Sequence, residues 1–209
     1  MGSSKTALQR TIGWGVASRQ LPGQAVCGDA YLVEPVADGV LMAVVDGLGH
    51  GDEAAAAAQT AVLTVKRHAG QPLPSLIEHC HAALMKTRGV VMTLATIHPV
   101  DGRLTWVGVG NVGATLLRAG GQAHAPPEYM LLHSGVVGYQ LPQLKRSTNQ
   151  IAPGELLVVA TDGIGEGFVK DVVYSDSPQQ IADRILSRHF QGHDDALVLV
   201  ARYGGHNHE

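Results

Sequence analysis

The sequence predicts an α+β fold in which mostly antiparallel sheets are covered by helices. Short apolar runs bounded by turn residues recur along the chain, which is typical of buried strands. Two helical segments lie between the early and middle strands, and a third precedes the last strand. Because no strict strand-helix-strand alternation occurs, the pattern does not favour a parallel doubly wound sheet.

The first half of the chain contains three predicted strands followed by two predicted helices. The strands are residues 11–18, 30–36 and the apolar run 40–45. A helix over 52–68 begins with acidic residues and ends with basic ones, as the helix dipole favours. Apolar residues at helical spacing predict a second helix over 75–88.

The second half turns to strands before one late helix. An antiparallel meander is predicted from strands separated by Gly and Pro turns, at residues 90–99, 103–110 and 113–118. Residues 119–135 show no regular pattern. Two further strands, an amphipathic helix and a last strand follow, at 145–151, 155–160, 178–190 and 196–201.

Length and charge limit the classes of function. A chain of 209 residues predicts a single domain over 1–209. The formal net charge of −3, without a long Lys/Arg run, argues against a nucleic-acid surface. No window approaches the roughly 18 apolar residues of a membrane span, and the first ten residues lack a secretory signal. We therefore expect a cytoplasmic protein that binds neither nucleic acid nor membrane.

Acidic residues stand at the ends of three apolar runs. The segments are VVDGLGHG at 44–51, VVATDGIGEG at 158–167 and GHDDALVLV at 192–200. Each one alone is typical of a turn or a helix cap. Together they present carboxylates at strand ends, where side chains can converge on hard divalent cations that prefer oxygen ligands. Spacing alone does not show that these strand ends are neighbours.

These segments, in this order, resemble the motifs of PP2C-type metal-dependent protein phosphatases, and most of all the SpoIIE-like group. The resemblance spans nearly the whole chain and is carried by Gly28-Asp29, Asp46-Gly47, Thr161-Asp162-Gly163, Asp194-Asp195 and GNVGATLLR at 110–118. It implies a PP2C-like α-β-β-α sandwich, in which two antiparallel sheets pack face to face with helices outside. It also implies a binuclear metal site at one edge and hydrolysis of phosphoserine or phosphothreonine without a phosphoenzyme.

The resemblance assigns a role to each candidate residue. Asp46 would bridge two divalent ions, Mn²⁺ or Mg²⁺, and the carbonyl of Gly47 would bind one of them. Asp162 and Asp194 would bind the other ion, and Asp29 would hold metal-bound waters. The resemblance implies that Asp195 would hold these ligands in place without binding a metal ion itself.

The chain departs from the family pattern at two places. Leu48 stands where many relatives have a histidine that protonates the leaving oxygen, which leaves His50 as the nearest candidate. His50 either takes that catalytic role or caps the following helix. Gln24 replaces the phosphate-binding arginine of eukaryotic members, so phosphate would be held by the metals alone. Asn111 is either a turn residue or a contact in the cleft.

The resemblance implies that the substrate is a phosphorylated STAS-domain protein of a bacterial stress-signalling complex such as the stressosome. An anti-anti-sigma factor is the alternative substrate. A catalytically inactive phosphoprotein-binding module and an enzyme for small molecules remain rival readings. No segment indicates a sensor domain, a coiled coil or a membrane span, which favours a small free-standing enzyme. We expect a monomer.

Overall fold

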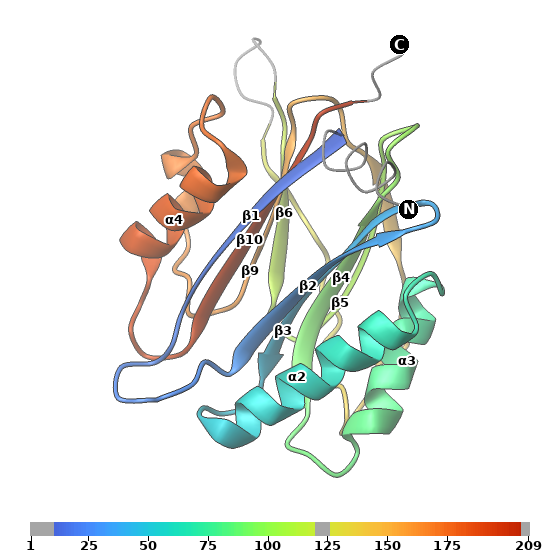
Figure 1. Cartoon of the computed structure of the whole chain (residues 1–209), viewed down its shortest axis with the longest axis vertical. Helices are drawn as coiled ribbons and strands as arrows, with labels where there is room; N and C mark the ends of the chain where they lie inside the picture. Colours follow the sequence, from blue (N-terminus) through green and yellow to red (C-terminus); the bar gives the residue numbers. More distant parts are fainter. Residues whose placement is uncertain (1–10, 120–125, 206–209) are drawn as a thin grey trace.

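The structure is a computed structural model that describes residues 11–119 and 126–205. In these residues, two five-stranded sheets lie face to face, with helices on the outer face of each (Figure 1). The strand orders are β1-β10-β9-β6-β7 and β2-β3-β4-β5-β8. All neighbouring strands within the two sheets pair antiparallel. The predicted sandwich of antiparallel sheets flanked by helices is confirmed.

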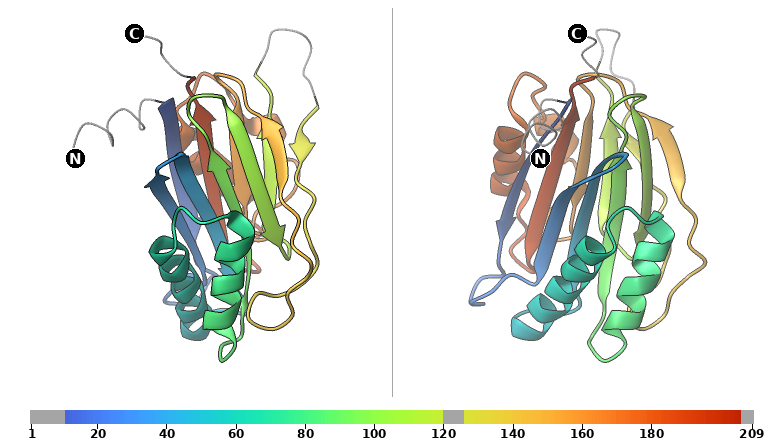
Figure 2. Two further views of the ribbon diagram at one scale, coloured as in Figure 1. Left: turned by 90° about the vertical axis from the view of Figure 1, so that its right-hand side faces the viewer. Right: turned by 45° about the vertical axis from the view of Figure 1, so that its right-hand side comes forward.

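The first sheet is covered by helix α4 (Pro178–His189) (Figure 2). Ser177 and Gln180 form a capping box at its start, so the chain begins this helix with its first amide groups satisfied. Its apolar side packs on the outer face of the sheet. The strands are β1 (Ile12–Arg19), β6 (Gly113–Leu117), β7 (Glu128–Tyr129), β9 (Leu156–Ala160) and β10 (Ala196–Tyr203).

The second sheet is covered by α2 (Asp52–Arg67) and α3 (Leu73–Leu84). The alanine-rich face of α2 lies close to the strands because its small side chains allow a near approach. The strands are β2 (Asp29–Val36), β3 (Gly39–Gly47), β4 (Val90–Ile97), β5 (Arg103–Val109) and β8 (Ser147–Gln150).

Strand β3 explains why a continuous apolar run precedes an aspartate. Val40, Met42 and Val44 pack between the two sheets. The alternate residues, of which Leu41 and Ala43 are examples, pack under the helices. A strand buried on both faces loses the usual apolar-polar alternation. The run ends at Asp46 because there β3 reaches the edge of both cores.

Helix α3 and the segment after β6 differ most from the sequence prediction. Helix α3 begins at Leu73, after Pro72, and ends at Leu84 instead of Arg88. The backbone amide and the hydroxyl of Thr87 both donate to the Leu84 carbonyl, which closes a turn and stops the helix. The segment expected to be irregular contains the short strand β7, paired with β6.

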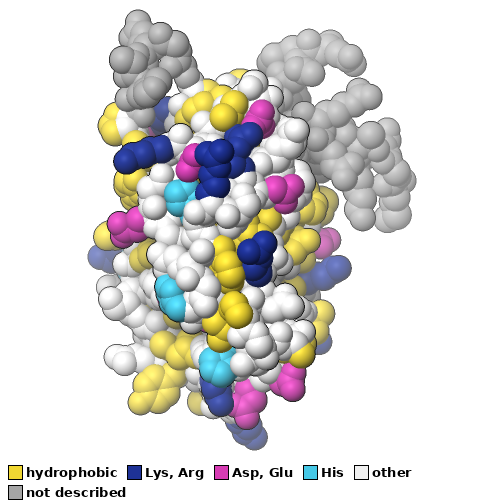
Figure 3. Space-filling model, turned by 90° about the vertical axis from the view of Figure 1, so that its left-hand side faces the viewer, with side chains coloured by type: hydrophobic (Ala, Val, Ile, Leu, Met, Phe, Trp, Pro, Cys, Tyr) yellow, Lys and Arg dark blue, Asp and Glu magenta, His cyan; other side chains and the backbone are white. Residues whose placement is uncertain are grey.

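On the α4 side, basic and acidic side chains lie interspersed and form no large patch of one sign (Figure 3). None of the helices in the described ranges is long and apolar enough to cross a membrane.

Candidate metal centre

Four strand termini meet at one edge of the sandwich. In the β2–β3 hairpin, Asp29 is the cross-strand partner of Asp46, so the two carboxylates lie on the same face of the sheet. In the other sheet, β9 leads into Asp162, and β10 is preceded by Asp194 and Asp195. Strands β9 and β10 are antiparallel neighbours, so the end of one lies beside the start of the other.

Hydrogen bonds join the two sheets at this edge. The Thr161 hydroxyl donates to Asp29 Oδ2 over 2.8 Å and accepts from the Leu197 amide over 2.8 Å. Asp195, which is 3% exposed, accepts from the backbone amides of Leu21 and Gly28 over 2.7 and 2.8 Å. Asp195 therefore holds the loop between β1 and β2, and that loop leads directly into Asp29.

Gly47 lets helix α2 approach the site. A Cβ built on Gly47 would lie 2.1 Å from the carbonyl oxygen of Ala54, so only glycine fits between β3 and the first turn of α2. The Gly47 amide donates to the Gly28 carbonyl over 3.2 Å. This contact fixes the backbone beside Asp46 against the loop that carries Asp29.

The surroundings of Asp29, which is buried, and of Asp46, which is half-buried, disfavour ionisation of both carboxylates. Burial, followed by the negative charge of Asp29, raises the pKa of Asp46 from 3.8 to about 8. Burial also raises the pKa of Asp29 to about 7, against the opposing effect of its hydrogen bond from Thr161. Asp162 and Asp194 add to the repulsion at both residues. In the described part of the chain, no lysine or arginine forms an ion pair with these carboxylates.

Asp162 is the exposed member of the group. The pKa of Asp162 lies above its usual value, because partial burial and the charge of Asp194 raise it. The charge of His193 and the hydrogen bond from Asn111 oppose this rise. The Asn111 amide nitrogen donates to Asp162 Oδ2 over 2.6 Å. Of the two readings of Asn111, the structure therefore supports the contact in the cleft.

The donor set fits hard divalent cations. It offers carboxylate oxygens, with negative charge that no neighbouring lysine or arginine balances in the described ranges. Among residues 11–119 and 126–205, no group of three or more His, Cys, Asp or Glu side chains is already arranged to hold a metal ion. Mg²⁺ commonly binds through one or two carboxylates and keeps several waters, so an open array of this kind suits it.

The two histidines of the region occupy different positions. His50 is exposed in the loop between β3 and α2. His193 acts electrostatically on Asp162, in the segment that precedes β10. The sequence prediction quoted this segment for its aspartates and did not select its histidine. Thr161 was also missed as a functional contact, because only the packing of the two sheets brings it to Asp29.

Arg88 provides a cation beside the loop that follows Asp46. Its guanidinium packs against Gly49 and pairs with Glu53 at the start of α2. Arg88 lies just before the start of β4, three positions before Val91, which is the cross-strand partner of Asp46. It is a candidate phosphate contact that the motif comparison did not indicate.

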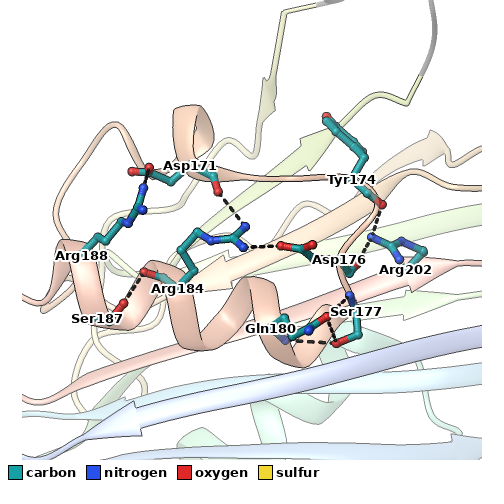
Figure 4. A network of polar contacts seen from close by, with 9 residues as sticks. All are labelled: Asp171, Tyr174, Asp176, Ser177, Gln180, Arg184, Ser187, Arg188 and Arg202. Carbon is teal, nitrogen blue, oxygen red and sulfur yellow. Dashed lines mark hydrogen bonds and ion pairs between the residues drawn. The ribbon is translucent and has the colours of Figure 1, made fainter.

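A cavity of about 630 Å³ borders Asp162. It is lined by Asn111, by Tyr129 and by the segment 164–169. The chain after that segment is fixed to α4, as Figure 4 shows: Asp171 pairs with Arg188, and Asp176 pairs with Arg184. Arg202 also donates to the carbonyl oxygens of Tyr174 and Asp176 over 2.9 and 2.8 Å. These contacts hold the segment as a fixed wall beside Asp162.

The chain is similar to known phosphatases over most of its length. Residues 37–204 match the family described as "Stage II sporulation protein E (SpoIIE)". The curated protein "Phosphoserine phosphatase RsbX" of Bacillus subtilis (strain 168) is 28% identical over 178 residues, which are 85% of this chain and 87% of that protein.

Solved structures give the same result for the fold. A chain from "The bacterial stressosome: a modular system that has been adapted to control secondary messenger signaling" is 30% identical, with a TM-score of 0.82, over 91% of this chain and 99% of that one. The structure "Crystal structure of RsbX in complex with magnesium in space group P1" has a TM-score of 0.81 and 23% identity, over 92% of this chain and 95% of that one.

Proposed function

The chain belongs to the SpoIIE family of PP2C-type phosphatases, and we propose that it dephosphorylates serine or threonine residues of STAS-domain proteins in a bacterial stress-signalling complex. One observation carries the catalytic part: buried Asp29 and half-buried Asp46 lie side by side at an edge where Asp162 and Asp194 add negative charge. Such an array is costly unless cations bind there. The proposal includes a single domain over 1–209 and a monomeric, cytoplasmic enzyme.

The family motifs supply the proposed ligands, and the strand pairing at this edge supports them. Asp46, the Gly47 carbonyl, Asp162 and Asp194 would hold two divalent ions, Mn²⁺ or Mg²⁺. Asp29, oriented by the hydrogen bond from Thr161, would hold metal-bound waters. The ions would supply an activated water and neutralise charge on the phosphoryl oxygens.

The remaining steps belong to the protein's own residues. Asn111 fixes the orientation of the Asp162 carboxylate through its hydrogen bond. Arg88 attracts the phosphorylated segment to the loop after Asp46. A proton for the leaving oxygen comes from His50 or from His193, which acts on Asp162. His193 is the better supported of the two.

A protein substrate is favoured by the shape of the site. The cavity beside Asp162 is open on the side of Tyr129, which is 70% exposed. Leu131, farther along the same segment, is 77% exposed. Exposed apolar side chains next to a reaction centre suit the surface of a protein partner. The similarity to RsbX and to a chain solved in stressosome work supports a substrate from that complex.

The direct test is release of phosphate from a phosphorylated STAS-domain protein with Mn²⁺, with Mg²⁺ and with a chelator. We expect metal-dependent release that falls at least about a hundredfold in Asp46→Asn. Asp38→Asn, an exposed aspartate at the other end of the same hairpin, is the matched control and keeps full activity.

Assays with different substrates distinguish the proposed function from its alternatives. A higher kcat/KM for a phosphorylated anti-anti-sigma factor would replace the stressosome assignment. Binding of phosphoprotein without turnover, in metal-loaded protein, would contradict the catalytic proposal and leave a binding module. Turnover of small phosphomonoesters alone would contradict the protein substrate.

A further inference from the structure

A second cavity, of about 460 Å³, lies on the outer face of the second sheet. Its floor is formed by β4, β5 and β8, and its walls by the turn at 36–38 and the α2–α3 connection at 70–73. Figure 2 shows that α2 and α3 cover only part of this sheet face and leave the far end of the strands open. On β3, that end is at Leu41, five residues from Asp46, or about 17 Å along the strand.

The floor of this cavity is a row of hydroxyl groups. Cross-strand pairing aligns Leu41 with Thr96, Thr96 with Thr105, and Thr105 with Thr148. Two residues nearer the carboxylate edge at Asp46, the same face of the sheet carries Leu94 and Val107, which are buried under the helices. The threonines thus mark the point where the face stops being core. The hydroxyls of Thr105 and Thr148 lie 3.4 Å apart.

Two arginines flank the threonine row from opposite sides. Arg103 precedes Thr105 by two residues on β5, and Arg146 precedes Thr148 by two residues at the start of β8. Because β5 and β8 run antiparallel, Arg103 lies on one side of the Thr105–Thr148 pair along the strands and Arg146 lies on the other side. Side chains two apart share a face, and both arginines line the cavity.

The two guanidinium groups differ in their partners. Arg146 forms no ion pair within the described ranges, whereas Arg103 forms a loose ion pair with Asp101, in which Nη1 lies 3.7 Å from Oδ2, beyond hydrogen-bond distance. A phosphoryl group would share Arg103 with Asp101. The Asp101 carboxylate is already engaged, since it contacts His98 Nδ1 at 2.7 Å and accepts from the Arg103 amide over 3.0 Å. The one carboxylate among the lining residues of the described chain belongs to Asp38, on the exposed turn at the rim.

The opposite wall is apolar. Pro72 and Leu73, at the start of α3, face the threonine row across the cavity, and Val36 closes one side. A ligand that fills this space therefore meets cations and hydroxyl donors at one end and a hydrocarbon surface at the other. The volume is within the range of small-molecule pockets, about 300–1,000 Å³.

We propose that this cavity binds a small organic phosphate, with its phosphoryl group between Arg103 and Arg146 over the threonine row. A phosphoryl group has three acceptor oxygens, which guanidinium forks and hydroxyls satisfy together. The organic part packs on Pro72 and Leu73. The site is distinct from the carboxylate edge and does not depend on the phosphatase assignment.

The test titrates phenyl phosphate into the full chain with a chelator present, so that metals do not hold the probe at the carboxylate edge. Binding is followed by NMR shifts of the Thr96, Thr105 and Thr148 signals. We expect saturable shifts in the parent and at least about tenfold weaker binding in Arg103→Gln/Arg146→Gln. Inorganic phosphate binds at the same signals but more weakly, because it lacks the apolar part.

One control and one further variant keep the result interpretable. Arg67→Gln/Lys170→Gln removes the same charge from exposed positions outside the cavity and keeps parental binding. Thr105→Val keeps the side-chain volume, removes one donor, and weakens binding about threefold. Absence of shifts at the threonines, equal binding by the double variant, or equal binding of inorganic phosphate would each overturn the proposal.

Discussion

Removing the charge of Asp46 should stabilise the metal-free protein at alkaline pH. Because burial and Asp29 raise the pKa of Asp46 to about 8, the folded chain holds its proton more tightly than the unfolded chain does. The stabilisation from that proton is fully present below about pH 4 and is lost as the pH rises through about 8. The side-chain amide of an Asp46→Asn variant cannot ionise, so the variant does not lose this stabilisation.

The size of the effect follows from the shift in pKa. Each pKa unit corresponds to about 1.4 kcal/mol, so a rise in the pKa of Asp46 from 3.8 to about 8 sets an upper limit of about 6 kcal/mol in unfolding free energy. Part of the shift at Asp46 is repulsion from Asp29, whose own pKa is raised to about 7 by burial and by the other aspartates of the edge, so the two carboxylates titrate as a coupled pair. We expect a gain of about 2 kcal/mol or more at pH 8, and a smaller one at pH 5.

Denaturant unfolding with a chelator at pH 5 and pH 8 measures this gain. Asp38→Asn, in the exposed turn of the same hairpin, serves as control and shows no pH-dependent gain. Saturating Mn²⁺ then reverses the order, because it stabilises the parent by about 2.7 kcal/mol at a hundredfold excess over Kd and loses its bridging ligand in the variant. A variant no more stable than the parent at pH 8 would refute the reasoning.

Two further predictions test the neighbourhood of this edge. Arg88→Gln should raise KM for the phosphoprotein by about three- to tenfold with little change in kcat, since the change removes a cation and no metal ligand. The matched variant is Glu53→Gln, in which Arg88 loses its ion-pair partner but keeps its charge. An equal rise in KM in Glu53→Gln would show that only the ion pair matters. Gly47→Ala should lower the unfolding free energy by about 2–3 kcal/mol in thermal melts, because its Cβ would meet Ala54. At Gly113, where a Cβ would lie 3.9 Å from its nearest neighbour, the same change should cost less than about 1 kcal/mol.

The fold was predictable where burial leaves a periodic trace. Strand β3 shows as an apolar run because it is buried on both faces, and α2 shows through its alanine face and charged ends. The end of α3 was not predictable in this way, because it depends on Thr87 donating to the Leu84 carbonyl. Strand β7 is too short for a period, and its pairing with β6 is a long-range contact.

The aspartates of the candidate site could be predicted from the sequence, but the hydrogen bonds between them and their neighbours could not. Each aspartate is visible in the sequence because it interrupts an apolar run, and the family motifs supplied its expected role. The hydrogen bonds of Thr161 to Asp29 and of Asn111 to Asp162 join residues that are 132 and 51 positions apart. Periodicity contains no information about such pairs, so only the packing of the sheets reveals them.

The pair Asp194-Asp195 shows why residue type alone does not assign a role. The two neighbours point into different surroundings: Asp195 is buried and accepts from Leu21 and Gly28, while Asp194 is only half-buried and acts on Asp46 and Asp162. Two backbone amides satisfy the charge of Asp195 without any cation, and they bind the β1–β2 loop to the first sheet. One carboxylate of the pair therefore builds the edge of the sandwich. Its neighbour, whose Oδ1 accepts from the Asp195 amide over 2.8 Å, stands where it can add a ligand for the ions that this edge is suited to bind.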